Sequence, residues 1–314
     1  MVQHMIRASV VQTCSQAYNL DATLQKLEEL TRLAKDRDGS QLAVFPEAFI
    51  GGYPKMSTFG AVVGLRAAQG RDEFLHYHSA AIEVPSAAIS RIEAISKETG
   101  VFLVVGVIER DGGTLYCTAV FIDPEQGYIA KHRKLAPTAS ERLIWGQGNG
   151  STLSVVDKDF GSSSEAAVPT KISAAICWEN YMPLLRYFYY SKGVQIYCAP
   201  TVDARPVWQN SMIHIALEGR CFVLAACQYA EEKDYPVDHA VADVSARNPQ
   251  NVMIAGGSVI VNPLGEVLAG PLLKGEGVLT ATLDLDDCIR GKFDLDVVGH
   301  YARPDVFSFS TNLQ

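Results

Sequence analysis

Three residues in this sequence carry the side chains that covalent hydrolysis requires. Cys177 ends the apolar run 171–176. Glu47 directly follows the apolar residues 42–46, and Lys134 closes a short basic segment. A thiol becomes an effective nucleophile when a base takes its proton or a nearby cation stabilises its anion. A carboxylate and an ammonium group supply both functions, so the set predicts cysteine hydrolase chemistry without a histidine base.

Two of these residues also have a plainer structural interpretation. Cys177 could be a small buried hydrophobe at the end of a core strand, and Glu47 could be a solvated acid in a turn. Function is favoured by the polar residues Glu179 and Asn180 after the cysteine and by the apolar residues after Glu47. Burial would raise the pKa of the Glu47 carboxyl group toward the range of a general base.

Lys134 belongs to the run Lys131-His132-Arg133-Lys134, which would ordinarily be a solvated face. Successive side chains of a strand point to opposite faces, so His132 and Lys134 share one face. An inward Lys134 could stabilise developing negative charge and lower the pKa of a nearby thiol. Glu141, seven residues further on, is a weaker candidate, because Glu-Arg pairs are common on surfaces.

Other chemistries fit less well. The seven histidines form no zinc-binding pattern, and His76 and His78 lack further ligands nearby in the sequence. No phosphate-binding loop of the Gly-x-x-x-x-Gly-Lys type occurs. A histidine partner for Cys177, as in cysteine proteases, stays open at this stage, because spatial neighbours cannot be read from the sequence.

Composition narrows the class of protein. The chain has 314 residues, of which 48% are hydrophobic and 20% charged, as in a globular enzyme with a sizeable core. A net charge of −8 argues against nucleic acid or an anionic membrane surface as a partner. Seven irregularly spaced cysteines, with no secretory signal or membrane span, predict a reducing, cytoplasmic location.

Hydrophobic periodicity predicts alternating strands and helices in both halves of the chain. Predicted helices cover about 19–37 with Gly39 as its stop, 85–99 with Pro85 in the first turn, 181–192 and 206–219. Predicted strands cover about 6–12, 41–45, 101–109, 114–123, 128–135, 171–177, 194–198, 221–228 and 278–285, with a hairpin at 262–265. This α/β pattern predicts two sheets packed face to face, with helices outside.

Six ordered segments resemble the nitrilase superfamily, and specifically its nitrilase branch. They lie at residues 45–54, 131–138, 141–148, 177–184, 256–258 and 299–305, so the resemblance covers nearly the full chain. Trp178 after the cysteine is more similar to nitrilases than to the amidase branches. Asn149 stands where the family usually carries aspartate, a difference that affects a loop and not the candidate triad.

The resemblance implies a four-layer α-β-β-α sandwich of two mixed sheets covered by helices. It implies a single domain over residues 1–314, with a C-terminal tail from about residue 297. It also implies a triad of Glu47, Lys134 and Cys177, supported by Glu141, with no cofactor and no metal. The candidate substrate-binding residues are Tyr53, Trp145, Trp178 and Thr201. Trp208 is a further pocket candidate, although an aromatic side chain on an amphipathic helix more often lies in the core. The stretch 53–80 either borders the pocket or is a plain surface connection.

The implied activity is hydrolysis of an organic nitrile to the carboxylic acid and ammonia through thioimidate and thioester intermediates. One alternative is a relative with the same triad that acts on cyanide or on a preformed amide. Another is a non-catalytic scaffold that retains the fold. Expected partners are a small-molecule nitrile and further copies of the chain, in a homodimer or a larger, spiral assembly. The apolar tail at 301–309 needs such a surface or the body of the protein to pack on.

Overall fold

The computed structural model describes residues 4–161, 168–237, 239 and 248–314. Within them, two mixed six-stranded sheets form the centre of the fold. The first has the order β16-β1-β2-β5-β6-β7 (Gly277–Asp284, Met5–Gln12, Leu42–Val44, Phe102–Asp111, Thr114–Asp123, Gly127–Arg133). The second has the order β15-β14-β11-β10-β9-β8 (Val267–Leu272, Ser258–Val261, Phe222–Ala225, Ile196–Cys198, Pro169–Ala174, Val155–Asp159).

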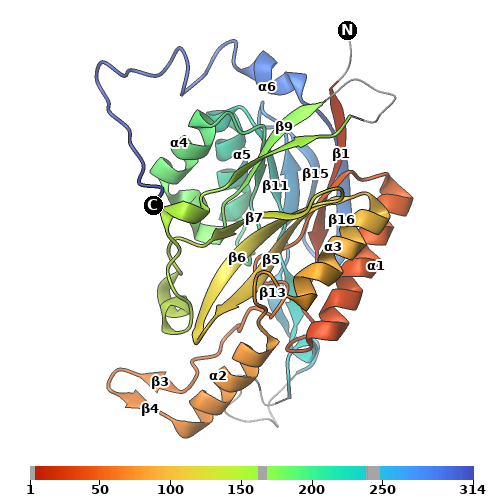
Figure 1. Ribbon diagram of the computed structural model, residues 1–314, viewed down its shortest axis with the longest axis vertical. Helices are drawn as coiled ribbons and strands as arrows, with labels where there is room; N and C mark the ends of the chain where they lie inside the picture. Colours follow the sequence, from red (N-terminus) through yellow and green to blue (C-terminus); the bar gives the residue numbers. More distant parts are fainter. Residues whose placement is uncertain (1–3, 162–167, 238, 240–247) are drawn as a thin grey trace.

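Two pairs of helices cover the outer faces of the sheets (Figure 1). Helices α1 (Leu20–Asp38) and α3 (Ala87–Thr99) pack on the first sheet, and α4 (Pro183–Ser191) and α5 (Val207–Gly219) on the second. The four-layer sandwich of two mixed sheets covered by helices is therefore confirmed. Alternation along the strands supplies both faces: Leu42 and Val44 point between the sheets, while Ala43 packs under the helices.

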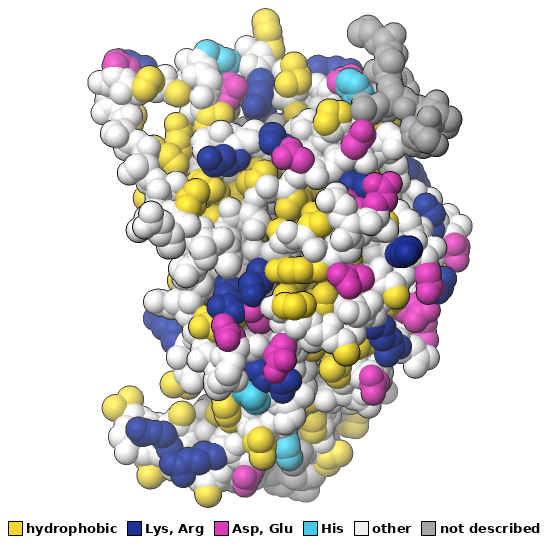
Figure 2. Space-filling model, viewed as in Figure 1, with side chains coloured by type: hydrophobic (Ala, Val, Ile, Leu, Met, Phe, Trp, Pro, Cys, Tyr) yellow, Lys and Arg dark blue, Asp and Glu magenta, His cyan; other side chains and the backbone are white. Residues whose placement is uncertain are grey.

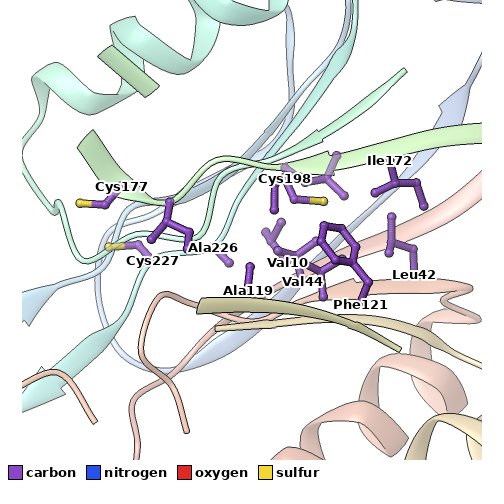
Figure 3. Packing of buried hydrophobic residues seen from close by; sticks show 14 of the residues in the cluster. Val10, Leu42, Val44, Ala119, Phe121, Ile172, Cys177, Cys198, Ala226 and Cys227 are labelled. Atoms are coloured by element: carbon purple, nitrogen blue, oxygen red, sulfur yellow. The ribbon is translucent and has the colours of Figure 1, made fainter. Parts of the chain in front are cut away.

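The core between the sheets is apolar where the strands cross (Figure 3). Val10, Val44 and Phe121 of the first sheet face Ile172 and Cys198 of the second. Cys177 and Cys227 lie at one end of this packing, beyond the last strand residues. The candidate nucleophile therefore lies at the edge of the apolar layer between the sheets and not at its centre.

Several element boundaries differ from the predictions. The first predicted helix ends as expected, because Gly39 adopts the left-handed conformation with φ of 66°. The helix predicted from Pro85 begins at Ala87, because the Ser86 side chain caps it by accepting a hydrogen bond from the Ile89 N–H. The strand predicted over 171–177 ends at Ala174, so Cys177 lies three residues beyond it.

The stretch 53–80 forms a projection at one end of the molecule. It contains the hairpin of β3 (Ala61–Val62) and β4 (Leu65–Arg66), followed by α2 (Ala68–Ala80). Figures 1 and 2 show the hairpin standing out from the body at the lower left, with basic and apolar side chains on its surface. Val63 at its tip is fully exposed.

The C-terminal tail follows the short helix α6 (Asp286–Gly291) and runs outside the sandwich before returning to α4 (Figure 1). Phe309 contacts Tyr187 edge-on, with ring centroids 4.9 Å apart. Tyr301 and Phe307 remain exposed. The tail thus packs on the body in part, and its remaining apolar side chains face outward.

Candidate active site

Glu47 is presented between the two sheets by a close backbone approach. It follows β2, where the segment passes against Gly106 of β5, and a Cβ at residue 106 would lie 2.1 Å from the Pro46 carbonyl oxygen. Gln228 Nε2, from the second sheet's side, donates to the Glu47 carbonyl oxygen at 2.7 Å. The Glu47 side chain is fully buried. Its position therefore depends on both sheets.

The two carboxylate oxygens of Glu47 have different surroundings. Oε1 accepts a hydrogen bond from Lys134 Nζ at 2.7 Å, and the Cys117 thiol lies 3.6 Å away. Oε2 has no nitrogen or oxygen donor among the described residues. Burial raises the pKa of Glu47, while the charge of Lys134 and contact with Cys177 offset part of that shift. An ionised Glu47 therefore has one oxygen available for a further proton.

Lys134 directly follows β7, and its side chain points toward the second sheet, as the alternation predicts. Its Nζ lies between Glu47 Oε1 at 2.7 Å and Glu141 Oε2 at 2.8 Å. Burial by itself would lower the pKa of Lys134, but Glu47 and the neighbouring groups raise it well above the ordinary value. Lys134 is therefore a fixed cation rather than a base.

Glu141 holds this lysine through a second set of contacts. It lies on the 3₁₀ turn η1 (Ala139–Leu143), where its Oε2 also accepts from the Thr138 N–H at 2.6 Å. The Tyr53 hydroxyl donates to Glu141 Oε1 at 2.9 Å. Trp145 is buried behind the group, with Lys134 Nζ 5.4 Å from its ring centroid. Trp145 Nε1 donates to the Tyr77 hydroxyl, so Trp145 supports the lysine and does not line the cavity.

Cys177 opens the 3₁₀ turn η3 (Cys177–Tyr181) in a left-handed conformation, with φ of 53°. A non-glycine residue in this region is uncommon and is held there by surrounding contacts, here the Cys177 N–H donating to the Pro200 carbonyl at 2.9 Å. Burial and the Glu47 carboxylate raise the pKa of Cys177, whereas Lys134 and a hydrogen bond from Thr201 lower it. The resting side chain is therefore a thiol, which needs a base to become a nucleophile.

Cys177 and Glu141 line an open cavity of about 520 Å³. Tyr53 and the half-exposed Trp178, two of the residues predicted to bind substrate, line it. Thr201 does not line it, because its side chain is fully buried and accepts from the Asp203 N–H. A neighbouring cavity of about 340 Å³ shares Tyr53 and Glu141, so the first part of the stretch 53–80 borders the site.

Two parts of the cavity wall were missed at the sequence level. Asp203 accepts from Trp178 Nε1 at 2.9 Å and pairs with Arg205, whose guanidinium carbon lies 4.8 Å from the Trp178 ring centroid. Polar residues directly after the apolar strand 194–198 were a signal for these two. The opposite wall is β13 (Val252–Ala255), which reaches the site only through tertiary packing.

Trp208, on α5, is buried in the core between this helix and the second sheet, and it does not line the cavity for which it was a candidate. Among the described residues, no group of three or more His, Cys, Asp or Glu side chains could hold a metal ion. In the same part of the chain, every helix is too short or too polar to cross a membrane.

Comparison with known proteins agrees with this arrangement. A family model described as carbon-nitrogen hydrolase matches residues 7–293. The chain belongs to this family. It is 74% identical over 306 residues to an arylacetonitrilase of Trametes versicolor, covering 97% of this chain and 96% of the relative. It is 53% identical to a bifunctional nitrilase/nitrile hydratase of Nicotiana tabacum, covering 96% and 85% of the two chains.

Solved structures share the fold of this carbon-nitrogen hydrolase. A nitrilase-superfamily member from Saccharomyces cerevisiae matches with a TM-score of 0.71 at 21% identity, over 96% of this chain and 97% of that one. The sequence relatives named as nitrilases assign the chain to the nitrilase branch, as the resemblance implied. The protein is thus a carbon-nitrogen hydrolase of the nitrilase type.

Proposed function

We propose that this carbon-nitrogen hydrolase converts arylacetonitriles to arylacetic acids and ammonia, with Cys177 as nucleophile, Glu47 as general base and Lys134 as the electrostatic stabiliser. The observation that carries the proposal is the contact among these three side chains, which come from three separate segments. Lys134 Nζ lies 2.7 Å from Glu47 Oε1, and Cys177 interacts with both groups and lines the cavity. The cavity volume of about 520 Å³ falls in the usual range for small-molecule sites. Trp178 and the β13 wall offer apolar surface for an aromatic ring.

The first half of the reaction forms a thioimidate. Glu47 takes the Cys177 proton on the oxygen that lacks another donor, and the sulfur attacks the nitrile carbon. Negative charge develops on the nitrile nitrogen, which Lys134 and the Trp178 backbone N–H stabilise before the nitrogen takes up the proton. Because Lys134 is held as a cation by two carboxylates, it stabilises this charge without first having to acquire a proton.

The second half consumes two water molecules. Glu47 activates the first water, which adds to the thioimidate carbon and gives a tetrahedral species that carries a hydroxyl, an amino group and the sulfur. Protonation of the amino group and loss of ammonia leave a thioester. The second water then releases the carboxylic acid and returns the thiol. Glu141 and Tyr53 keep Lys134 in place throughout, through the contacts at 2.8 and 2.9 Å.

The test is product release from phenylacetonitrile, benzonitrile, an aliphatic nitrile, phenylacetamide and cyanide by the wild type and Cys177→Ala. We expect acid and ammonia from phenylacetonitrile in the largest amount, and no activity in Cys177→Ala. Cys227→Ala is the matched control, because Cys227 is an equally buried thiol beside Cys177 and holds none of the three roles.

Other results would change the assignment in defined ways. Turnover of phenylacetamide or cyanide alone would leave the roles of the three residues unchanged and would change the substrate assignment. Equal activity of wild type and Cys177→Ala would remove the nucleophile assignment. A preference for the aliphatic nitrile would contradict the aromatic substrate class alone.

We further propose that the protein is cytoplasmic and works as a homodimer or a larger, spiral assembly. The support for assembly is apolar surface: Leu184, Tyr301 and Phe307 are exposed near the tail and α4, and Val63 and Leu65 are exposed on the hairpin. Patches of this kind commonly mark contact surfaces. The seven cysteines are all unpaired thiols, which fits a reducing compartment. Light scattering of the purified protein measures the mass of the assembly, and a monomer would contradict the prediction.

A further inference from the structure

A second buried pair of charged side chains lies beside the site and takes no part in the steps above. His132 lies on β7 and precedes Lys134, the first residue after that strand, by two residues. Glu179 follows Cys177 by two residues on η3. Both side chains are fully buried, with His132 Nε2 3.0 Å from Glu179 Oε2 and 3.2 Å from Oε1. The pair therefore connects the lysine-bearing strand of one sheet to the cysteine-bearing turn of the other.

Glu179 makes this connection through backbone groups as well. Its Oε1 accepts from the N–H of Leu135, the residue after Lys134, at 2.6 Å. Its Oε2 accepts from the N–H of Ile176, the residue before Cys177, at 2.8 Å. One carboxylate thus binds the two backbone segments that carry the ammonium group and the thiol.

The partners of His132 define its protonation state. Nδ1 lies 3.1 Å from the Thr152 carbonyl oxygen, which only accepts hydrogen bonds. Nε2 faces a carboxylate that already accepts two backbone N–H groups, so it too faces an acceptor. Burial alone would lower the pKa of His132, but Glu179 outweighs burial and raises it. The arrangement is an imidazolium-carboxylate pair with both ring nitrogens donating.

We propose that His132 and Glu179 are positioning residues that hold Lys134 in register with Cys177 and so favour the acid over the amide as product. The proposal rests on the nitrile hydrolysis proposed above. We refer to the two side chains, with the Leu135 and Ile176 backbone bonds, as the Glu179 clamp.

The choice between products is made at the tetrahedral species. If the amino group is protonated, ammonia leaves, the thioester forms and a second water gives the acid. If it is not protonated, the thiolate is the better leaving group, the carbon–sulfur bond breaks and the hydroxyl proton is lost to give the amide. The acid route thus requires the charged groups around Lys134 to stay aligned with the nitrogen on the Cys177 adduct. Loosening the clamp moves these groups relative to the adduct and favours the amide.

The clamp has a matched counterpart on the other side of the same strand. Glu109 is buried on β5 and accepts from Lys131 Nζ at 2.5 Å and from Arg133 Nε at 2.9 Å. It joins β7 to its own sheet, and its hydrogen-bond partners among the described residues all lie in that sheet, away from the cysteine-bearing turn. Loss of Glu109 therefore loosens the strand without releasing Lys134 from Cys177.

The experiment compares Glu179→Gln, His132→Gln and Glu109→Gln with the wild type, measuring acid, amide, kcat, KM and thermal unfolding on phenylacetonitrile. Glu179→Gln places the side-chain NH₂ of glutamine against a backbone N–H, where the wild type has an accepting oxygen. We therefore expect kcat to fall by about 10²-fold and the share of amide product to rise about tenfold, with little change in KM. His132→Gln keeps one donor toward Glu179 and should shift the product ratio in the same direction by less. Glu109→Gln should leave the product ratio unchanged.

Two results overturn the proposal: an unchanged amide share in Glu179→Gln that remains folded, or an equal rise in Glu109→Gln. If Glu179→Gln does not fold, the product ratio of His132→Gln decides in its place. A wild type that makes neither acid nor amide from any nitrile removes the proposed function itself, and the clamp proposal with it.

Discussion

Buried carboxylates lie on both sides of the segment formed by β7 and Lys134, but the balance of charge around them differs. On the side that faces the helices, Glu109 is shared by two cations, Lys131 and Arg133. On the side that faces the second sheet, one cation, Lys134, is shared by Glu47 and Glu141. The hydrogen bonds from Arg133 and Lys131 outweigh burial and lower the pKa of Glu109, whereas burial raises the pKa of Glu47.

The comparison separates a structural charge cluster from a reactive one. The two cations around Glu109 keep its carboxylate ionised and donate hydrogen bonds to it, so this carboxylate does not act as a proton acceptor. Excess negative charge around Lys134 leaves an oxygen of Glu47 without a nitrogen or oxygen donor among the described residues. The same strand and the same residue types therefore yield a stable ion cluster on one side and a proton acceptor on the other.

Replacing the cation on each side should give the largest contrast. Lys134→Met removes the charge that stabilises the developing anion and leaves two carboxylates facing each other, so kcat/KM should fall by about 10³-fold. Lys131→Met leaves Arg133 on Glu109, and kcat/KM should change by no more than about threefold. Steady-state kinetics on a nitrile measures both. Similar losses in the two variants would mean that the two clusters are functionally equivalent.

A smaller effect is expected from the backbone approach that only the reactive side requires. Gly106→Ala places a Cβ 2.1 Å from the Pro46 carbonyl oxygen and 2.8 Å from Glu47 Cα, so the Glu47 segment must move. We expect the free energy of unfolding to fall by about 1–3 kcal/mol, with a marked loss of kcat. Gly113→Ala is the control, because its Cβ would meet nothing within 4 Å. Normal kcat in Gly106→Ala would show that Glu47 tolerates displacement.

The pH dependence of stability should give the smallest effect, with opposite signs for the two glutamates. The lowered pKa of Glu109 stabilises the fold above 4.5, and that contribution is lost as the pH falls through the lowered pKa. The raised pKa of Glu47 means that the fold loses stability as the pH rises from 4.5 through the raised value. Melting temperatures of Glu109→Gln and Glu47→Gln from acid to neutral pH, relative to wild type, should therefore diverge in opposite directions. Parallel trends would contradict this assignment.

Much of the difference between the two charge clusters could be predicted from the sequence, because the alternation of side chains along a strand decides which residues share a face. Alternation along 131–134 was enough to set Lys134 opposite Lys131, and the apolar runs before Glu47 and Cys177 were enough to predict buried strands. The resemblance supplied the triad and the four layers. Tyr53 and Trp178 were predicted to bind substrate, and both line the cavity.

The remainder required knowledge of packing. Trp145 and Thr201 were also predicted to bind substrate. Both side chains are buried and lie outside the lining of the cavity, a placement that residue type alone does not reveal. The wall formed by β13 comes from a part of the chain about 75 residues after Cys177 and has no local signal. The partnership of His132 and Glu179 joins two sheets and depends on distances that periodicity does not contain.

The pairing of β16 with β1 has a consequence for how the protein is made. Met5 lies opposite Asp284 and Gln12 opposite Gly277, so β1 pairs with a strand that is synthesised more than 260 residues after it. At about 5–20 residues per second, β1 waits about 10–50 s for this partner. During that interval the apolar residues of β1 adjoin an unpaired edge that can capture other nascent chains. The yield of folded enzyme should therefore depend on how well chaperones shield this edge until β16 has been synthesised.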